Sequence, residues 1–184
     1  MIMKVLKFTL VSGNKDKLSE WKRLLQSSAI VTNAEIDLDE IQSLDLKKIV
    51  EQKAVSAYEL IHQPVVVEDV SLGLDSLSGL PGPFIKFFNE RMGTEGLYKL
   101  TNGRGDDATV SCCVTYYDGI NFTTVQADVR GRVVASRGAG GFGYDEVFIH
   151  EVSVKTYAEM TQEEKDSVSH RSKAVALLIK ALSK

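Results

Sequence analysis

The sequence predicts an α/β fold, and three observations support this prediction. Apolar and amphipathic segments alternate through the first third of the chain in the order β-α-β-α-β. One of these segments, Val65-Val66-Val67, is short and wholly apolar, as strands buried on both faces are. Strand-like alternation then dominates the middle of the chain, which predicts a second lobe and a cleft between it and the α/β part.

The individual elements of the α/β part follow from the periodicity of its apolar residues. The predicted strands and helices are strands at 5–11, 30–36 and 65–67, and helices at 15–27 and 46–61. The third strand is expected to end at Glu68 and Asp69.

The second half of the chain begins with a rigid turn, Leu80-Pro81-Gly82-Pro83. Asp118-Gly119 is typical of a hairpin turn, and Thr161 with Glu164 three residues later is a capping box that begins a short helix. The other predicted elements are helices at 84–91 and 94–100, strands at 109–117 and 121–134, a glycine-rich loop at 137–143, and a last helix from Ser169.

Composition limits the class of protein. A chain of 184 residues predicts one domain, or one domain with a small lobe. The net charge of −3 disfavours a broad nucleic-acid-binding surface. The apolar start is broken by lysines and lacks a signal-peptide cleavage site, and no apolar run is long enough to span a bilayer. The adjacent Cys112 and Cys113 do not suggest a disulfide framework, so we expect a cytoplasmic protein that does not bind a membrane.

A candidate anion site follows the first predicted strand, where the chain reads Ser12-Gly13-Asn14-Lys15-Asp16-Lys17. The backbone N–H groups at the start of a helix have no partner within the helix, and the helix dipole favours negative charge there. With two lysines added, this corner suits a polyphosphate. Taken alone, the pattern also fits a solvated turn capped by Asn14.

Carboxylates are expected close to this corner, because ligands of open α/β sheets bind beyond the carboxyl ends of the strands. Glu40 follows the second predicted strand and Asp69 the third. Carboxylates beside a phosphate-binding corner require a cation between them, and Mg²⁺ prefers such oxygen ligands. The alternative is that the two are unrelated, solvated carboxylates.

Further candidate residues lie along the rest of the chain. Phe142 and Tyr144 leave the glycine-rich loop, and aromatic rings can stack on a nucleobase; core packing is the alternative. His170 and Arg171 begin the last helix, where the dipole disfavours cations, so an acidic or electron-rich group should compensate them. Lys53, Lys86 and Lys165 are three further candidate site residues. The alternative is that each is an ordinary surface lysine, because lysine side chains are usually exposed.

Taken together, these segments resemble the inosine triphosphate pyrophosphatase family, also called Ham1-like or RdgB-like nucleotide pyrophosphatases. The resemblance covers essentially the whole chain, and the order and spacing of the motifs make it specific. The motifs are Ser12 to Lys17, Val67-Glu68-Asp69, Gly79-Leu80-Pro81-Gly82-Pro83 with Lys86, Gly141-Phe142-Gly143-Tyr144-Asp145, Tyr157-Ala158-Glu159-Met160, Glu164-Lys165 and Ser169-His170-Arg171.

The resemblance implies an elongated, mixed-sheet α/β fold of two lobes around a nucleotide-binding cleft, usually in a homodimer. It also implies hydrolysis of ITP, dITP and XTP to the monophosphate and pyrophosphate. Glu40 and Asp69 look like the Mg²⁺ carboxylates, and Asp69 is similar to the residue that activates the attacking water. The residues similar to the family's phosphate contacts are Ser12, Gly13, Asn14, Lys15, Asp16 and Lys17, and Lys53 and Lys86 are similar to further substrate contacts that line the cleft. Phe142, Gly143, Tyr144 and Asp145 are similar to the wall that stacks on the base, and Lys165, His170 and Arg171 to the residues that close over the nucleotide, the last two at the base edge.

Two other functions remain open for the sequence alone. A Maf-like pyrophosphatase acting on pyrimidine or modified nucleotides shares the core architecture, but Ser169-His170-Arg171 argues against it. A non-catalytic nucleotide-binding module would tolerate loss of Glu40 and Asp69, yet both are present. Glu146 departs from the family pattern, which usually has proline after the aspartate, so the shape of this loop is open.

Overall fold

The structure, a computed structural model, describes residues 6–25, 29–36 and 38–183. The chain forms two compact units. The first unit comprises Met1–Asp69, Cys112–Ala127 and Ser172–Lys184, and the second comprises Val70–Ser111 and Asp128–Arg171. We describe each unit separately.

The strands form a mixed sheet in the order β2-β1-β3-β5-β6-β7, with β4 paired to β3. Parallel pairing joins β1 to both β2 and β3, whereas β3–β4 and β6–β7 are antiparallel. The α/β class and the mixed sheet are therefore confirmed. The strands are β1 (Leu6–Val11), β2 (Ala29–Ala34), β3 (Val65–Leu74), β4 (Pro81–Gly82), β5 (Asp106–Tyr117), β6 (Phe122–Val133) and β7 (Phe148–His150).

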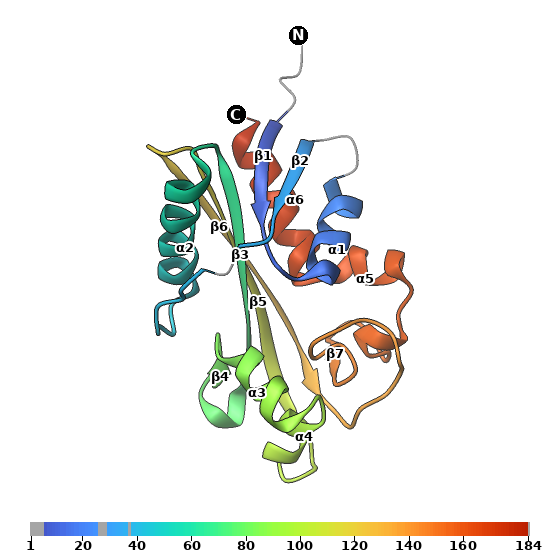
Figure 1. Cartoon of the computed structure of the whole chain (residues 1–184). Coiled ribbons are helices and arrows are strands. Elements are labelled where there is room, and N and C mark those ends of the chain that lie inside the picture. Colours follow the sequence, from blue (N-terminus) through green and yellow to red (C-terminus); the bar gives the residue numbers. More distant parts are fainter. Residues whose placement is uncertain (1–5, 26–28, 37, 184) are drawn as a thin grey trace. The chain divides into compact units, whose positions relative to one another are not determined.

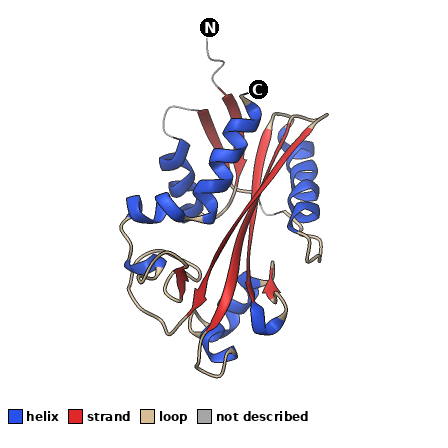
Figure 2. Ribbon diagram, turned by 180° about the vertical axis from the view of Figure 1, so that it is seen from behind, coloured by secondary structure: helices blue, strands red, loops and turns tan. Residues whose placement is uncertain are grey.

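In the first unit, helices cover both faces of the strands. Helix α2 (Leu46–Ile61) lies on one face, and α1 (Lys15–Leu25) and α6 (His170–Leu182) lie on the other (Figures 1 and 2). Helix α2 packs Val50, Ala54 and Ala57 against Val65 and Val67 of β3. Burial of both faces explains why these strand residues are all apolar.

The second unit has its own core, formed by β strands, short helices and the segment after the glycine-rich loop. Its helical elements are η1 (Asp75–Leu77), α3 (Ile85–Met92), α4 (Gly96–Leu100), η2 (Tyr157–Glu159) and α5 (Gln162–Val168). Three aromatic side chains, Tyr144, Phe148 and Tyr157, pack edge to face in this core, with adjacent ring centroids 6.4 and 5.1 Å apart.

Most predicted elements are confirmed. Helix α2 has the predicted bounds, and α1 agrees with the prediction from Lys15 to Leu25. The remaining predicted positions, residue 5 of the first strand and residues 26–27 of the helix, lie outside the described residues. Thr161 forms the predicted capping box with Glu164, and both cysteines are free and buried.

One prediction is wrong: β3 does not end at Glu68 and Asp69 but continues to Leu74. The continuation pairs with β4, where Leu72 faces Gly82 and Gly73 faces Pro81. This pairing keeps the chain extended beyond the acidic residues. Asp69 therefore lies inside a strand, rather than at its end.

No helix among the described residues has both the length and the apolar character needed to cross a bilayer.

Candidate active site

The turn between β1 and α1 has the predicted cap. The Asn14 side-chain oxygen accepts a hydrogen bond from the backbone N–H of Lys17 at 3.0 Å. The Ser12 hydroxyl accepts one from the N–H of Asn14 at 3.2 Å, and the N–H of Ser12 donates to the carbonyl of Ala34 on β2 at 3.1 Å. The turn is thus fixed to the sheet, while Gly13, Asn14, Lys15 and Asp16 stay exposed.

The ammonium group of Lys17 pairs with a buried carboxylate at this corner. Lys17 Nζ lies 3.2 Å from Glu68 Oε1, and the side chains are 20% and 3% exposed. The indole N–H of Trp21 donates to Glu68 Oε2 at 2.6 Å. Because Lys17 and Trp21 are four residues apart on α1, they share a helix face and reach the same carboxylate.

The structure brings together two other predicted site residues of the first unit, Glu40 and Lys53. Lys53 Nζ on α2 donates to Glu40 Oε1 at 2.6 Å, and the Glu40 side chain is 42% exposed. Residues Val65 and Val67 of β3 pack against α2, and alternation along the strand puts Asp69 on that same face. Glu40 thus contacts α2, and Asp69 belongs to the face of β3 that α2 covers.

This donor set fits Mg²⁺ better than a metal held by protein alone. Among the residues that the structure describes, no group of three or more His, Cys, Asp or Glu could hold a metal ion. Mg²⁺ is usually held by one or two carboxylates together with waters and substrate phosphates. Glu40 and the half-buried Asp69 are the two carboxylates predicted for this role.

In the second unit, the glycine-rich loop is fixed by a buried ion pair. Lys165 Nζ on α5 donates to Asp145 Oδ2 at 2.6 Å, and the side chains are 8% and 4% exposed. The same oxygen accepts the backbone N–H of Phe142 at 2.9 Å. Gly141 has φ +73°, and a Cβ there would lie 2.1 Å from Asp145 Oδ2, so the loop requires glycine at this position.

Aromatic rings contact both His170 and Arg171 at the start of α6. The hydroxyl group of Tyr144 lies 3.1 Å from His170 Nε2, and the Tyr157 ring stacks on the imidazole with the centroids 6.2 Å apart. The guanidinium carbon of Arg171 lies 5.5 Å from the centre of the Phe142 ring. The π face of Phe142 thus lies within cation–π distance of the Arg171 guanidinium.

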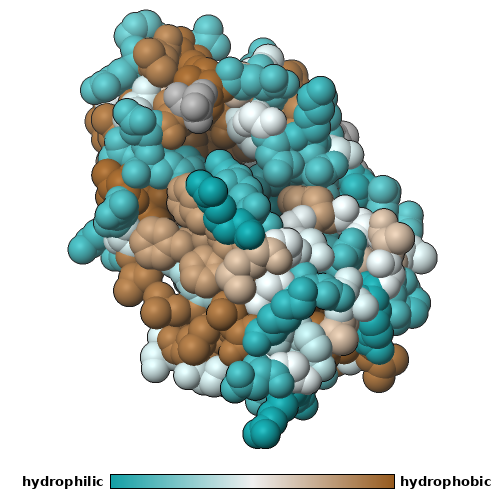
Figure 3. Space-filling view, turned by 60° about the horizontal axis from the view of Figure 1, so that its bottom comes forward, coloured by the Kyte–Doolittle hydropathy of each residue, from teal (hydrophilic) through white to brown (hydrophobic). Residues whose placement is uncertain are grey.

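Lys86 differs from the other predicted residues of the second unit because its side chain is exposed. It lies on α3, which also exposes Phe87 (55%) and Met92 (42%). Figure 3 brings forward the part at the bottom of Figure 1, where α3 lies, and shows hydrophobic side chains gathered beside hydrophilic ones.

Glu146, which departs from the family pattern, accepts hydrogen bonds from two other segments of the second unit. Its Oε2 atom accepts hydrogen bonds from the hydroxyl groups of Ser136 at 2.9 Å and Thr94 at 3.1 Å. The carboxylate thus connects the loop before the glycine-rich segment to the turn before α4.

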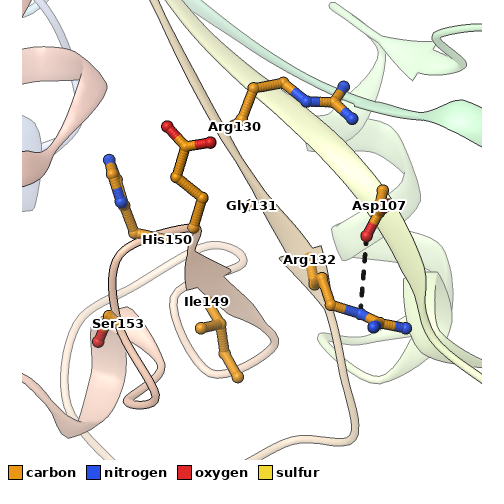
Figure 4. Close-up of a pocket in the computed structure, with 8 residues that line it drawn as sticks. Asp107, Arg130, Gly131, Arg132, Ile149, His150 and Ser153 are labelled. Atoms are coloured by element: carbon orange, nitrogen blue, oxygen red, sulfur yellow. Dashed lines mark ion pairs between the residues drawn. The ribbon is translucent and has the colours of Figure 1, made fainter.

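A separate cavity of about 290 Å³ in the second unit contains none of the predicted site residues (Figure 4). Its lining includes Arg130, Arg132, Asp107 and His150. Arg132 pairs with Asp107 at 3.7 Å, and Arg130 pairs with Asp75 at 2.7 Å, which holds the pKa of the Asp75 carboxyl below its usual value. None of the residues predicted for the site lines this cavity, so it is described separately from the candidate site.

Sequence reasoning missed two residues of the first-unit corner, Glu68 and Trp21. The sequence alone assigned no role in the site to either residue. The available signal was the i, i+4 spacing of Lys17 and Trp21, which puts an indole N–H beside the predicted phosphate lysine.

Comparison with known proteins gives consistent results. Residues 8–181 match the model of the Ham1 family. Inosine triphosphate pyrophosphatase 2 of Trypanosoma cruzi is 43% identical over 176 residues, covering 94% of this chain and 90% of that protein. Inosine triphosphate pyrophosphatase of Emericella nidulans is 39% identical, covering 96% and 95%.

Solved structures agree with the fold. A HAM1 protein from Coxiella burnetii has a TM-score of 0.83 at 23% identity, over 97% of this chain and 99% of that one. A Mycobacterium abscessus protein described as a nucleoside-triphosphatase, or dITP/XTP pyrophosphatase, has a TM-score of 0.71 at 26% identity, over 94% and 98%.

Proposed function

Because this chain belongs to the Ham1 family, we propose that it hydrolyses non-standard purine nucleoside triphosphates to the monophosphate and pyrophosphate. The substrates are ITP, dITP and XTP, so the enzyme clears the nucleotide pool of these bases. The observation that supports the proposal is the corner between β1 and α1, where an exposed turn begins the helix and Lys17 lies one turn further on; such a corner suits an anion.

The residues of the first unit bind the phosphates in this proposal. Backbone N–H groups of the turn and the ammonium groups of Lys15 and Lys17 neutralise phosphate oxygens. Lys53, whose ammonium pairs with Glu40, adds a further cation to the proposed substrate contacts. Positioning and charge neutralisation supply most of the catalysis in phosphate chemistry, and this set provides both.

Glu40 and Asp69 would hold Mg²⁺, which when bound polarises phosphate oxygens and offsets the charge of the pyrophosphate leaving group. Asp69 also accepts the proton of the attacking water, as its family counterpart is proposed to do. Its half-buried place inside β3 supports this role, because a strand fixes a side chain more firmly than a loop does.

The residues of the second unit bind the base. Phe142 supplies a ring for stacking, and His170 and Arg171 supply donors for the C6 oxygen of hypoxanthine or xanthine. Adenine has an amino group at this position, and each mismatched donor costs about 1–3 kcal/mol. Lys86, Gly143, Tyr144, Asp145 and Lys165 complete the proposed substrate contacts; the pair of Asp145 with Lys165 supports the loop that carries Phe142.

Two further features complete the proposal. The free, buried cysteines are typical of proteins in reducing compartments, which supports a cytoplasmic location. A homodimer is proposed from the family resemblance alone, and light scattering on the purified protein measures it directly.

A panel of nucleoside triphosphates tests the substrate class. Purified protein with Mg²⁺ should release pyrophosphate from ITP, dITP and XTP about 30-fold or more faster than from ATP, because the two donor mismatches cost at least about 2 kcal/mol together. Faster turnover of UTP or dTTP would favour the Maf-like alternative. Binding of ITP without any turnover would indicate a non-catalytic module.

Substitution of Asp69 tests the chemical role. Asp69→Asn should abolish turnover of ITP and keep the melting temperature close to that of the wild type. Asp107→Asn is the matched control, because it removes a carboxylate that is 59% exposed and outside the proposed site, and its turnover should be unchanged. Undiminished turnover by Asp69→Asn would remove Asp69 from the mechanism.

A further inference from the structure

The carboxylate of Glu68 is held from two sides by one helix. Its Oε2 atom accepts the indole N–H of Trp21 at 2.6 Å, and its Oε1 atom lies 3.2 Å from the ammonium of Lys17. The Glu68 side chain is only 3% exposed, so water contributes little to its solvation. A buried carboxylate needs such partners, because an unpaired one is strongly disfavoured.

Trp21 is well suited to fix the carboxylate in one orientation. Its side chain is completely buried, and its ring meets the edge of Phe8 at an interplanar angle of 80° with the centroids 6.5 Å apart. An indole has a single donor and few accessible rotamers in a packed core. The direction of its N–H therefore sets the position of both carboxylate oxygens.

Lys17 is the movable member of the group. A lysine has a flexible stem and loses considerable rotamer freedom when its ammonium is fixed. Its side chain is 20% exposed here, so the ammonium reaches solvent while it is anchored on Glu68. A lysine held in this way meets an incoming anion with less loss of entropy than a free one.

We propose that Trp21 and Glu68 are positioning residues for Lys17: the buried indole fixes the Glu68 carboxylate, and the carboxylate presents the Lys17 ammonium to the phosphates. This inference rests on the proposed function, in which Lys17 contacts the triphosphate. Neither Trp21 nor Glu68 contacts the substrate, and no proton is transferred between them.

A double-mutant cycle tests this positioning role, here called the relay from Trp21 through Glu68 to Lys17, because Trp21 acts on the substrate only through Lys17. Trp21→Phe keeps the ring and removes the donor, and it should lower kcat/KM for ITP about 5- to 10-fold. Lys17→Met should then cost several-fold less in the Trp21→Phe background than in the wild type. Equal losses in the two backgrounds, which a merely structural role for Trp21 predicts, would overturn the proposal.

The matched control is Tyr117→Phe. It removes another aromatic donor of the first unit, the hydroxyl that donates to the carbonyl of Gly119 at 3.0 Å. Its kcat/KM should stay within about twofold of the wild type, and its effect should add to that of Lys17→Met. If Trp21→Phe does not fold, Glu68→Gln replaces it in the same cycle with the same expectation.

A binding measurement gives an independent readout. Trp21 is the sole tryptophan, so the intrinsic fluorescence of the protein reports on its indole alone. Inorganic tripolyphosphate should change this emission in a saturable way, and saturated Lys17→Met should show no such change. Constant emission in the wild type, while calorimetry shows that tripolyphosphate binds, would contradict the relay. A wild-type protein that binds and shows the relay but does not hydrolyse ITP would contradict the proposed function instead.

Discussion

The two units each contain one buried carboxylate that accepts an N–H group and pairs with a lysine, but the two lysines differ in exposure. In the first unit, Glu68 accepts the indole N–H of Trp21, and its lysine, Lys17, is 20% exposed at 3.2 Å. In the second unit, Asp145 accepts the N–H of Phe142, and its lysine, Lys165, is 8% exposed at 2.6 Å.

The difference in exposure indicates different roles: the Lys17 pair holds an ammonium near solvent, whereas the Lys165 pair stabilises a loop. The longer, partly solvated pair leaves the ammonium of Lys17 accessible to an anion. The shorter, buried pair fixes the glycine-rich loop, and Gly141 allows the close approach. The same substitution, lysine to methionine, should therefore mainly lower stability in the Lys165 pair and mainly lower activity in the Lys17 pair.

The largest effect is expected from Lys165→Met on stability. It removes the buried Lys165–Asp145 ion pair, and breaking such a pair typically costs about 3–5 kcal/mol in the free energy of unfolding. Lys17→Met should cost less, because the ion pair that it removes is longer and its lysine side chain is 20% exposed, against 8% for Lys165. Urea denaturation of both variants measures the difference. Equal losses would mean that the two pairs support the fold equally.

The next effect is expected from Lys17→Met on activity. Loss of a cation that stabilises developing phosphate charge should lower kcat/KM for ITP about 100-fold or more. Steady-state kinetics at saturating Mg²⁺ measure this, with Lys22→Met, on the same helix and exposed, as the control. A loss of less than threefold would show that Lys17 is not the main phosphate contact.

A smaller effect is expected at the base side. Phe142→Leu keeps an apolar side chain but removes the ring, and base stacking is worth about 1–3 kcal/mol. KM for ITP should rise about tenfold while kcat changes little, because the stacked base is remote from the reacting phosphate. Phe87→Leu, an exposed ring on α3, is the control. A fall in kcat with unchanged KM would argue against stacking.

The smallest effect concerns the helix that carries Lys165. The Lys155 ammonium and the Thr161 N–H hold the pKa of Glu164 below its ordinary value of 4.5. Because the folded-state pKa is lowered, the stabilisation is present above pH 4.5 and is lost as the pH falls through the folded-state pKa. Glu164→Gln should therefore show a flatter melting temperature below pH 4.5 than the wild type. Parallel pH profiles would contradict this.

Local sequence patterns predicted the parts of the fold that local contacts determine. The cap at Asn14, the bounds of α2 and the capping box at Thr161 depend on residues within a few positions of each other. The continuation of β3 to Leu74 and the short strand β7 were not predicted, because they depend on pairing with β4 and β6. A strand of three residues also carries too little periodicity to be recognised.

The same distinction applies to the candidate site. The corner from Ser12 to Lys17 and the carboxylates Glu40 and Asp69 were predicted from motifs and family resemblance, and their roles stay predictions. The link between Trp21 and Glu68 joins residues 47 positions apart, so only the folded chain shows it. Asp145 and Lys165 were predicted as substrate contacts, and their mutual pairing over 20 positions was not.

The products formed from ITP test the central claim most directly. With Mg²⁺, the purified protein should convert ITP to IMP and inorganic pyrophosphate in equal amounts, because cleavage falls between the α- and β-phosphates. Release of orthophosphate with IDP, or no release of pyrophosphate at all, would contradict the account.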